Sequence, residues 1–198
     1  MISLALIAGL LLGIADAFRG TALASFTIDD EKKLGREFYE KLDKANALSR
    51  NEQANAFLSQ LGNRILSQSN NVLFDFRFSI VQSSAVNAFA TPGGYVYVNQ
   101  GLISLVENEA QLAGVLAHEI AHVNGRHIAE IIDRSTVLNL STLAAIIAGA
   151  FLGGSGDAMA AVTSYSLATA STLTLKYSRE HEEAADRIGM AYLVAAGY

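Results

Sequence analysis

The chain has no cysteine and only one proline among its 198 residues. Without cysteine it cannot form a disulfide bond, a zinc ribbon or a lipid-modified N-terminal cysteine. The formal net charge of −5 lacks the basic excess of nucleic-acid-binding proteins, so we expect no nucleic-acid partner. Neither internal repeats nor low-complexity linkers are present. With 51% hydrophobic residues, the chain can bury a sizeable core, and we expect one main domain.

Two stretches have almost no charged side chains. Residues 2–14 are a nearly unbroken apolar run, and Ala22-Leu23-Ala24 matches a signal-peptidase cleavage pattern. We therefore expect residues 1–24 to be a secretory signal peptide and residues 25–198 to be the main domain. No lysine or arginine precedes the apolar run, so an uncleaved N-terminal anchor is the alternative. Residues 135–156 carry no charge, and we expect a packed helical hairpin there, with a membrane segment as the alternative.

The pattern of apolar residues predicts a mainly helical α+β domain. Apolar side chains recur at helical spacing in residues 28–47 and 52–67. In residues 74–80, apolar and polar side chains alternate, which is typical of a half-buried strand. Residues 87–91 and 95–99 are expected to be paired antiparallel strands around a glycine-rich turn.

Residues 118–122 read His-Glu-Ile-Ala-His, the HExxH pattern of zinc hydrolases. Residues i and i+4 lie on one face of a helix, so His118 and His122 can direct both imidazoles at one metal ion. Glu119 lies about 100° around the helix. There it would flank the metal and take a proton from a water that the metal activates. The alternative is a buried amphipathic helix whose two histidines only form hydrogen bonds.

A catalytic zinc site needs a third protein ligand and an open fourth position. His127 is one candidate, but a continuous helix would turn it about 140° from the ligand face. We therefore expect His127 at the helix end or behind the ligands. Glu182 is the better candidate, because it shares one face of a second helix with Asp186. Asp186 could then accept a hydrogen bond from a ligand histidine and fix its orientation.

Other polar residues near Glu182 are weaker candidates. Glu180 and Glu183 are rival ligands, but neither has an aspartate four residues further on. His181 is next to Glu182 and so points about 100° away from it on a helix. Arg179 could stabilise an oxyanion or form an ion pair with the acidic side chains.

Two motifs together resemble a known family. HExxH at residues 118–122, followed by Ser-Arg-x-x-Glu-x-x-x-Asp at residues 178–186, resembles the gluzincin peptidases that include the HtpX heat-shock protease and the CAAX prenyl protease. Residues 87–99 and 34–37 resemble the soluble periplasmic branch of that family, the beta-barrel assembly-enhancing proteases. The resemblance covers about residues 28–198.

The resemblance implies a zincin-like fold and a set of site residues. The fold would be mainly helical, with a small antiparallel sheet and a pair of helices that bracket zinc. One zinc ion per chain would be held by His118, His122 and Glu182. Glu119 would act as the general base, and Asp186 would lie behind a ligand histidine.

The resemblance also implies how substrate binds. The strand with Asn87, Ala88, Phe89 and Ala90 would bind an extended peptide by strand addition, although an ordinary hairpin is the alternative. Binding through the backbone favours unfolded chains over particular side chains. We therefore expect a zinc-dependent metalloendopeptidase that hydrolyses unfolded or misassembled envelope proteins in the periplasm. The outer-membrane assembly machinery is a candidate partner.

Two further interpretations remain open on the sequence. The chain could be a non-proteolytic, zinc-stabilised, chaperone-like binding module for outer-membrane clients. It could also be a protease held at the inner membrane through residues 1–20 or 135–156. The family normally continues beyond Tyr198, so we expect the metallopeptidase domain to be incomplete at its C-terminus.

Overall fold

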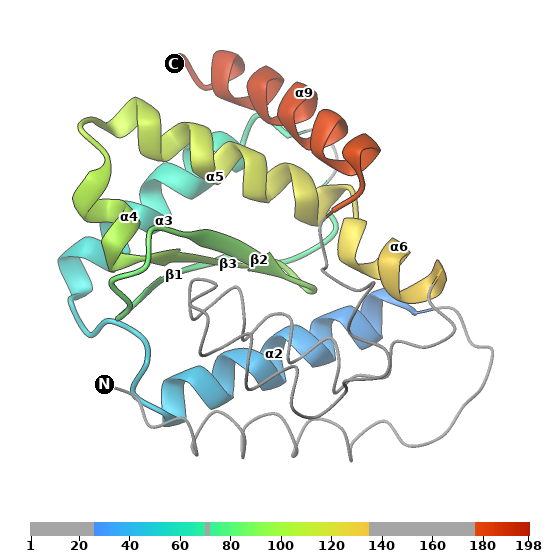
Figure 1. Ribbon diagram of the computed structural model, residues 1–198, viewed down its shortest axis with the longest axis horizontal. Coiled ribbons are helices and arrows are strands. Elements are labelled where there is room, and N and C mark those ends of the chain that lie inside the picture. Colours follow the sequence, from blue (N-terminus) through green and yellow to red (C-terminus); the bar gives the residue numbers. More distant parts are fainter. Residues whose placement is uncertain (1–25, 70–71, 135–176) are drawn as a thin grey trace.

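The computed structural model describes residues 26–69, 72–134 and 177–198 (Figure 1). The signal peptide or anchor predicted for residues 1–24 lies outside these residues. So does the hairpin or membrane segment predicted for residues 135–156. In the part of the chain that is described, no helix is both long enough and apolar enough to cross a membrane.

Three short strands form a sheet at the centre of the molecule: β1 (Arg77–Val81), β2 (Ala88–Thr91) and β3 (Tyr95–Asn99). Their order in the sheet is β1-β3-β2. β2 and β3 are antiparallel, as predicted. The turn between them uses Gly93 and Gly94 at φ values of 83° and 94°, a region that favours glycine.

The sheet is mixed, so the prediction of a small antiparallel sheet was wrong for the pairing of β1 with β3. β3 lies between β1 and β2; it runs parallel to β1 and antiparallel to β2. Side-chain alternation indicates which residues share a face of a strand, but it does not indicate the order of the strands. The predicted α+β class is confirmed.

Helices cover both faces of the sheet (Figure 1). α2 (Ile28–Lys44) lies on one face. α3 (Glu52–Leu66) and α5 (Glu109–Asn124) lie on the other face, and α9 (Arg179–Ala195) packs along the outer side of α5. A short helix, α4 (Gln100–Leu105), connects β3 to the segment that leads into α5.

Two apolar cores result from this arrangement. Alternate side chains of the strands point to opposite faces, so each core takes residues from the sheet. The larger core, between the sheet, α3 and α5, includes Leu58, Phe78, Ile80, Val96, Val98, Leu112 and Leu116. The smaller core, between the sheet and α2, includes Leu34, Phe38, Leu42, Val81, Phe89 and Tyr97.

Side-chain caps set where the two site-bearing helices begin. The Asn108 carboxamide oxygen accepts a hydrogen bond from the Gln111 N–H at 3.0 Å, at the start of α5. The Ser178 hydroxyl accepts one from the His181 N–H at 3.2 Å, at the start of α9. A fixed start sets which side chains of each helix face the other helix.

α5 ends at Asn124 instead of continuing to His127. Gly125 is the C-cap, and Arg126 takes a left-handed conformation with φ of 52°. α6 (His127–Arg134) begins immediately afterwards in a new direction. The prediction that His127 lies about 140° from the ligand face assumed a continuous helix, and that helix does not form. His127 instead comes close to His122.

Candidate metal centre

α5 and α9 pack closely enough for their side chains to share one site. The close approach depends on Gly189 of α9, where a Cβ atom would lie 3.0 Å from the carbonyl oxygen of Ala117 and 3.1 Å from the nitrogen of His118. A side chain at position 189 would therefore push α9 away from α5. The absence of one brings Glu182 and Asp186 of α9 to His118 of α5.

Three side-chain atoms with lone pairs converge between the two helices. His122 Nε2 lies 2.9 Å from His118 Nε2, and Glu182 Oε2 lies 3.4 Å and 3.9 Å from the His118 and His122 Nε2 atoms. Such atoms repel one another unless they share a proton or a cation. Among the described residues, these three form the one group of histidine and acidic side chains able to hold a metal ion. The structure thus brings the three predicted ligands together.

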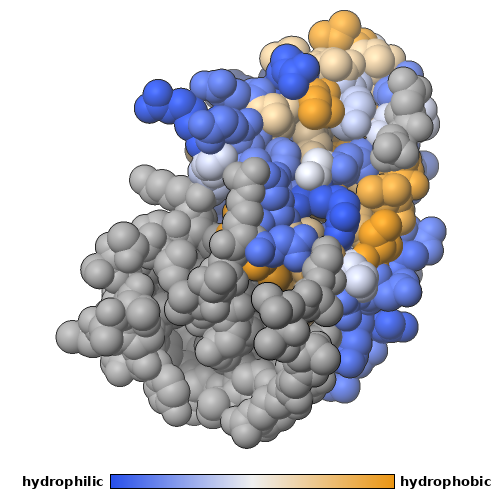
Figure 2. Space-filling model, turned by 90° about the vertical axis from the view of Figure 1, so that its right-hand side faces the viewer, coloured by the Kyte–Doolittle hydropathy of each residue, from blue (hydrophilic) through white to orange (hydrophobic). Residues whose placement is uncertain are grey.

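The rival ligands of α9 lie elsewhere. Glu180 and Glu183 are exposed, outside the cluster. His181 is buried and its Nε2 lies 3.0 Å from Glu130 Oε2, away from the ligands as predicted. Arg179 is exposed in the first turn of α9. The surface on this side of the molecule is largely hydrophilic where residues are described (Figure 2).

The three candidate ligand residues differ in burial. The side chain of His122 is 1% exposed, that of His118 is 29% exposed and that of Glu182 is 46% exposed. Burial, followed by the charges of the neighbouring His118, His127 and His181, lowers the pKa of His122 to about 3. The His122 imidazole is therefore neutral near pH 7 and keeps a lone pair for a metal.

Each histidine has a partner at its Nδ1 atom. His118 Nδ1 lies 2.9 Å from Asp186 Oδ1, and His122 Nδ1 lies 2.8 Å from His127 Nδ1. A partner at Nδ1 fixes the tautomer in which Nε2 is free to bind a metal. Asp186 lies where it was predicted, next to a histidine of the cluster. His127 was expected either at the helix end or behind the ligands, and its contact with His122 Nδ1 places it behind them.

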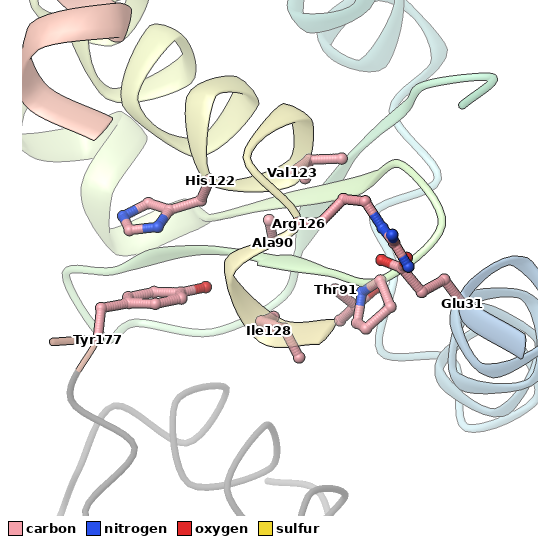
Figure 3. A pocket seen from close by; sticks show the side chains of 9 residues that line it. Glu31, Ala90, Thr91, His122, Val123, Arg126, Ile128 and Tyr177 are labelled. Atoms are coloured by element: carbon pink, nitrogen blue, oxygen red, sulfur yellow. The ribbon is translucent and has the colours of Figure 1, made fainter. Parts of the chain in front are cut away.

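Tyr177 is a contact that the sequence did not indicate. Its ring stacks on the His122 ring, with centroids 3.8 Å apart and planes 22° apart (Figure 3). Burial, followed by the charges of Glu119 and Glu182, raises the pKa of its hydroxyl, which therefore stays protonated. Its only signal in the sequence is its position next to Ser178, the N-cap of α9, and that position is compatible with many roles.

Glu119 lies between the ligand cluster and the edge of the sheet. Burial of its carboxyl, together with repulsion from Glu182, raises the pKa of Glu119 to about 7. The backbone N–H of Ala90 faces the carboxylate and acts in the opposite direction. A cation held by the cluster would also favour the carboxylate. Glu119 can therefore gain or lose a proton near neutral pH beside both the cluster and β2.

β2 is an edge strand, and only alternate residues direct their backbone groups outward. The Asn87 carbonyl accepts a hydrogen bond from the Asn99 N–H, so alternation directs Phe89 toward β3 and Ala88 and Ala90 away from it. The Phe89 side chain is buried in the smaller core. Of the four predicted substrate-binding residues, Ala88 and Ala90 thus have backbone groups on the outer edge, whereas those of Asn87 and Phe89 face β3.

Comparisons with known proteins find one matching family and several relatives. Residues 52–198 match Peptidase family M48. The chain is 34% identical over 180 residues to the beta-barrel assembly-enhancing protease of Yersinia pestis, and 32% identical over 184 residues to that of Escherichia coli strain K12. It is 28% identical over 173 residues to the mitochondrial metalloendopeptidase OMA1 of Schizosaccharomyces pombe.

These alignments cover most of the chain but a smaller part of each relative. They include 90% of the chain for the two bacterial proteins and 86% for the yeast protein. The chain spans 37% of the length of the bacterial relatives and 49% of the length of the yeast relative.

Proposed function

Because the chain belongs to peptidase family M48, we propose that it is a zinc-dependent metalloendopeptidase whose metal is held by His118, His122 and Glu182. The family resemblance inferred from the two sequence motifs is confirmed, and family membership implies a metal cofactor. The observation that carries the proposal is the convergence of three ligand atoms beside Glu119.

The spacing of the three ligand atoms supports zinc. Zinc with tetrahedral ligands at about 2.0–2.1 Å places neighbouring ligand atoms roughly 3.3–3.4 Å apart. The separations of 2.9, 3.4 and 3.9 Å among His118, His122 and Glu182 bracket that value. Two neutral imidazoles and one carboxylate are donors that zinc accepts, whereas magnesium and calcium prefer oxygen ligands. Three protein ligands also leave the fourth position for water or substrate.

The residues around the cluster can carry out peptide hydrolysis. Zinc, when bound, supplies Lewis acidity that polarises a carbonyl group and makes a water molecule easier to deprotonate. The Glu119 carboxylate takes the proton of the attacking water and then gives it to the nitrogen of the leaving amine. Asp186 holds the His118 ring through Nδ1 while this happens. The outward backbone groups of Ala88 and the outward carbonyl of Ala90 align an extended peptide along β2, whereas the Ala90 N–H faces the Glu119 carboxylate.

The substrate class follows from this mode of binding and from the relatives. Backbone hydrogen bonds select extended chains, so we propose unfolded or misassembled proteins as substrates. The name of the bacterial relatives, beta-barrel assembly-enhancing protease, supports a role in the cell envelope with the outer-membrane assembly machinery as a partner. We place residues 25–198 in the periplasm, reached through a signal peptide at residues 1–24, with an inner-membrane anchor as the alternative.

The test compares the wild-type chain with Glu119→Gln, with zinc content and casein cleavage measured for both. Glutamine is close to glutamate in size but cannot accept the proton, and residue 119 is not one of the three proposed ligands. We expect one zinc ion in each protein and a rate of cleavage that is lower by about 100- to 10,000-fold in the variant, the usual contribution of a general base. His118→Ala is the control for the metal, and we expect it to lose zinc.

Two results would contradict the proposal. Zinc in both proteins with cleavage by neither would favour the zinc-stabilised binding module. Absence of zinc from the wild-type chain would show that His118, His122 and Glu182 are not zinc ligands.

A further inference from the structure

We propose that His127 is a positioning residue for His122, and that the turn at Gly125 and Arg126 serves to bring its imidazole behind that metal ligand. The inference rests on the proposed metal site and deepens it. It explains how a ligand histidine is oriented by a second imidazole in place of a carboxylate.

The contact between the two imidazoles defines their tautomers. The Nδ1 atoms of His122 and His127 lie 2.8 Å apart, and both residues are buried. Two nitrogens at this separation attract each other only when one proton lies between them, because two lone pairs or two N–H groups would repel. A metal needs the lone pair on His122 Nε2, so His122 Nδ1 carries the proton and donates it to His127 Nδ1. His127 then carries its own proton on Nε2.

The turn after α5 creates this contact. The left-handed backbone of Arg126, at φ of 52°, changes the direction of the chain and lets His127 begin α6 facing back toward His122. Gly125 leaves room for the ring, because a Cβ there would collide with His127 Nε2 and lie 2.8 Å from its Cδ2 atom. The φ of Gly125 is −74°, which any residue can adopt. Glycine is therefore needed at position 125 because the His127 ring occupies the space of a Cβ atom, and not because of the backbone conformation.

The left-handed arginine is held in place by α2 and the residues just before it. Its Nε donates to Glu31 Oε1 of α2 at 2.6 Å (Figure 3). Its Nη2 donates to the Phe26 carbonyl at 2.9 Å. A non-glycine residue in this conformation is strained. The Glu31 side chain is 2% exposed and that of Arg126 is 34% exposed, so the contact is partly shielded from water and can offset the strain.

His181 fixes the other side of the His127 ring. The two rings stack with centroids 4.6 Å apart and planes 13° apart. His181 Nε2 in turn lies 3.0 Å from Glu130 Oε2 on α6. Because His181 directly precedes Glu182, the array connects both ligand-bearing helices. His118, by contrast, relies on Asp186, whose side chain is 75% exposed.

The test uses two substitutions of His127 in the full chain. His127→Leu removes the acceptor, whereas His127→Asn places an amide oxygen near the position of Nδ1 and can accept the same hydrogen bond. Zinc affinity is measured by competition with a chromophoric chelator, and the melting temperature of each metal-free protein is measured alongside. We expect His127→Leu to bind zinc about 10- to 100-fold more weakly, as for other partners of metal ligands. His127→Asn should stay within a few-fold of wild type.

Two more variants separate positioning from general packing. Gly125→Ala keeps His127 but displaces its ring, and we expect weaker zinc binding. Ile132→Val alters another side chain of α6, which packs against the smaller core, and we expect unchanged zinc affinity. Nitrogen-15 NMR of the zinc-bound wild-type chain should show a proton on His122 Nδ1 and none on His127 Nδ1.

The outcomes distinguish this inference from the function on which it rests. Zinc binding by His127→Leu as tight as that of wild type would overturn the inference alone. So would a loss of affinity in His127→Asn equal to that in His127→Leu. A wild-type chain that binds no zinc would overturn the proposed function and the inference with it.

Discussion

His118 and His122 project from the same face of one helix, yet their surroundings differ. His122 is enclosed by Tyr177 on its ring face and His127 at Nδ1. His118 remains partly exposed and contacts a carboxylate that is largely in water. A buried ligand is held by packing as well as by its hydrogen bond, whereas an exposed one depends on the hydrogen bond alone. His122 therefore provides the rigid side of the cluster, and His118 with Glu182 provides the open side.

Ala88 offers a single-residue test of substrate binding along β2. Its N–H points outward from the edge of the sheet, so Ala88→Pro removes a donor to the substrate without removing a hydrogen bond to β3. One hydrogen bond contributes about 0.5–1.5 kcal/mol, so we expect kcat/KM for unfolded casein to fall by about 2- to 12-fold at unchanged zinc content. The measurement is steady-state cleavage with zinc quantified in parallel.

Ala88→Ser is the matched control, because it keeps the N–H and adds only one oxygen atom. We expect its kcat/KM to stay close to that of wild type. If Ala88→Pro cleaves casein as well as Ala88→Ser, the outer edge of β2 does not bind substrate through this donor.

At the scale of helices, Gly189 sets the distance between α5 and α9. A Cβ atom at this position would press on backbone atoms of Ala117 and His118, which cannot rotate away. We expect Gly189→Val to lower the free energy of unfolding by about 1–3 kcal/mol, the usual cost of overpacking. We also expect weaker zinc binding, because the displaced helix carries Glu182. Urea unfolding and chelator competition measure the two effects.

Gly114→Ala provides the comparison within the same helix pair. A Cβ at Gly114 meets only the Cδ2 atom of Leu193, at 3.9 Å, so it fits without displacement. Alanine is favoured over glycine in a helix by up to about 1 kcal/mol, and we expect equal or greater stability with unchanged zinc affinity. If Gly189→Val and Gly114→Ala have the same stability and the same zinc affinity, the distance between α5 and α9 does not control the site.

The helices show how far the sequence predicts this site. HExxH and ExxxD depend only on the 3.6-residue repeat of a helix, so the spacing of His118 and His122, and of Glu182 and Asp186, predicted which side chains share a face. The position of His127 could not be predicted in the same way. It depends on a left-handed arginine, a conformation for which the local sequence gives no signal and which a distant ion pair to Glu31 stabilises.

The sheet shows the same limit at larger scale. Alternation of apolar residues predicted a strand at residues 74–80, of which residues 77–80 lie in β1. The glycine-rich turn predicted that β2 and β3 pair. The parallel pairing of β1 with β3 depends on contacts between residues far apart in the chain. Those contacts leave no periodic pattern in either strand. Short-range spacing therefore predicts elements and their faces, and long-range packing decides how the elements are joined.

Across the whole molecule, the pair of Glu31 and Arg126 joins α2, on one face of the sheet, to the turn that follows α5 on the other. Burial raises the pKa of Glu31, and the hydrogen bond and charge of Arg126 only partly offset this. The folded protein therefore holds the Glu31 proton more tightly than the unfolded chain does. The resulting contribution to stability is complete below the usual pKa of glutamate, about 4.3, and is lost as the pH rises through the raised value.

Arg126→Gln tests this connection through its pH dependence. The substitution removes both effects that lower the pKa of Glu31, so the buried carboxylate becomes costlier once it ionises. We expect the free energy of unfolding, measured in urea with a chelator present, to be lower than that of wild type by about 1–3 kcal/mol at pH 7.5. At pH 4 the difference should be smaller, because Glu31 is then largely protonated in both folded proteins.

Arg50→Gln is the control, since Arg50 pairs with Asp43 at 2.9 Å and both side chains are well exposed, at 63% and 41%. An exposed pair contributes about 0–1 kcal/mol, and we expect only a small effect at both pH values. The loss of unfolding free energy on removing an arginine should increase with pH only where that arginine stabilises a buried carboxylate. If the effect of Arg126→Gln is the same at pH 4 and pH 7.5, the ionisation of Glu31 does not couple α2 to the turn behind the metal ligands.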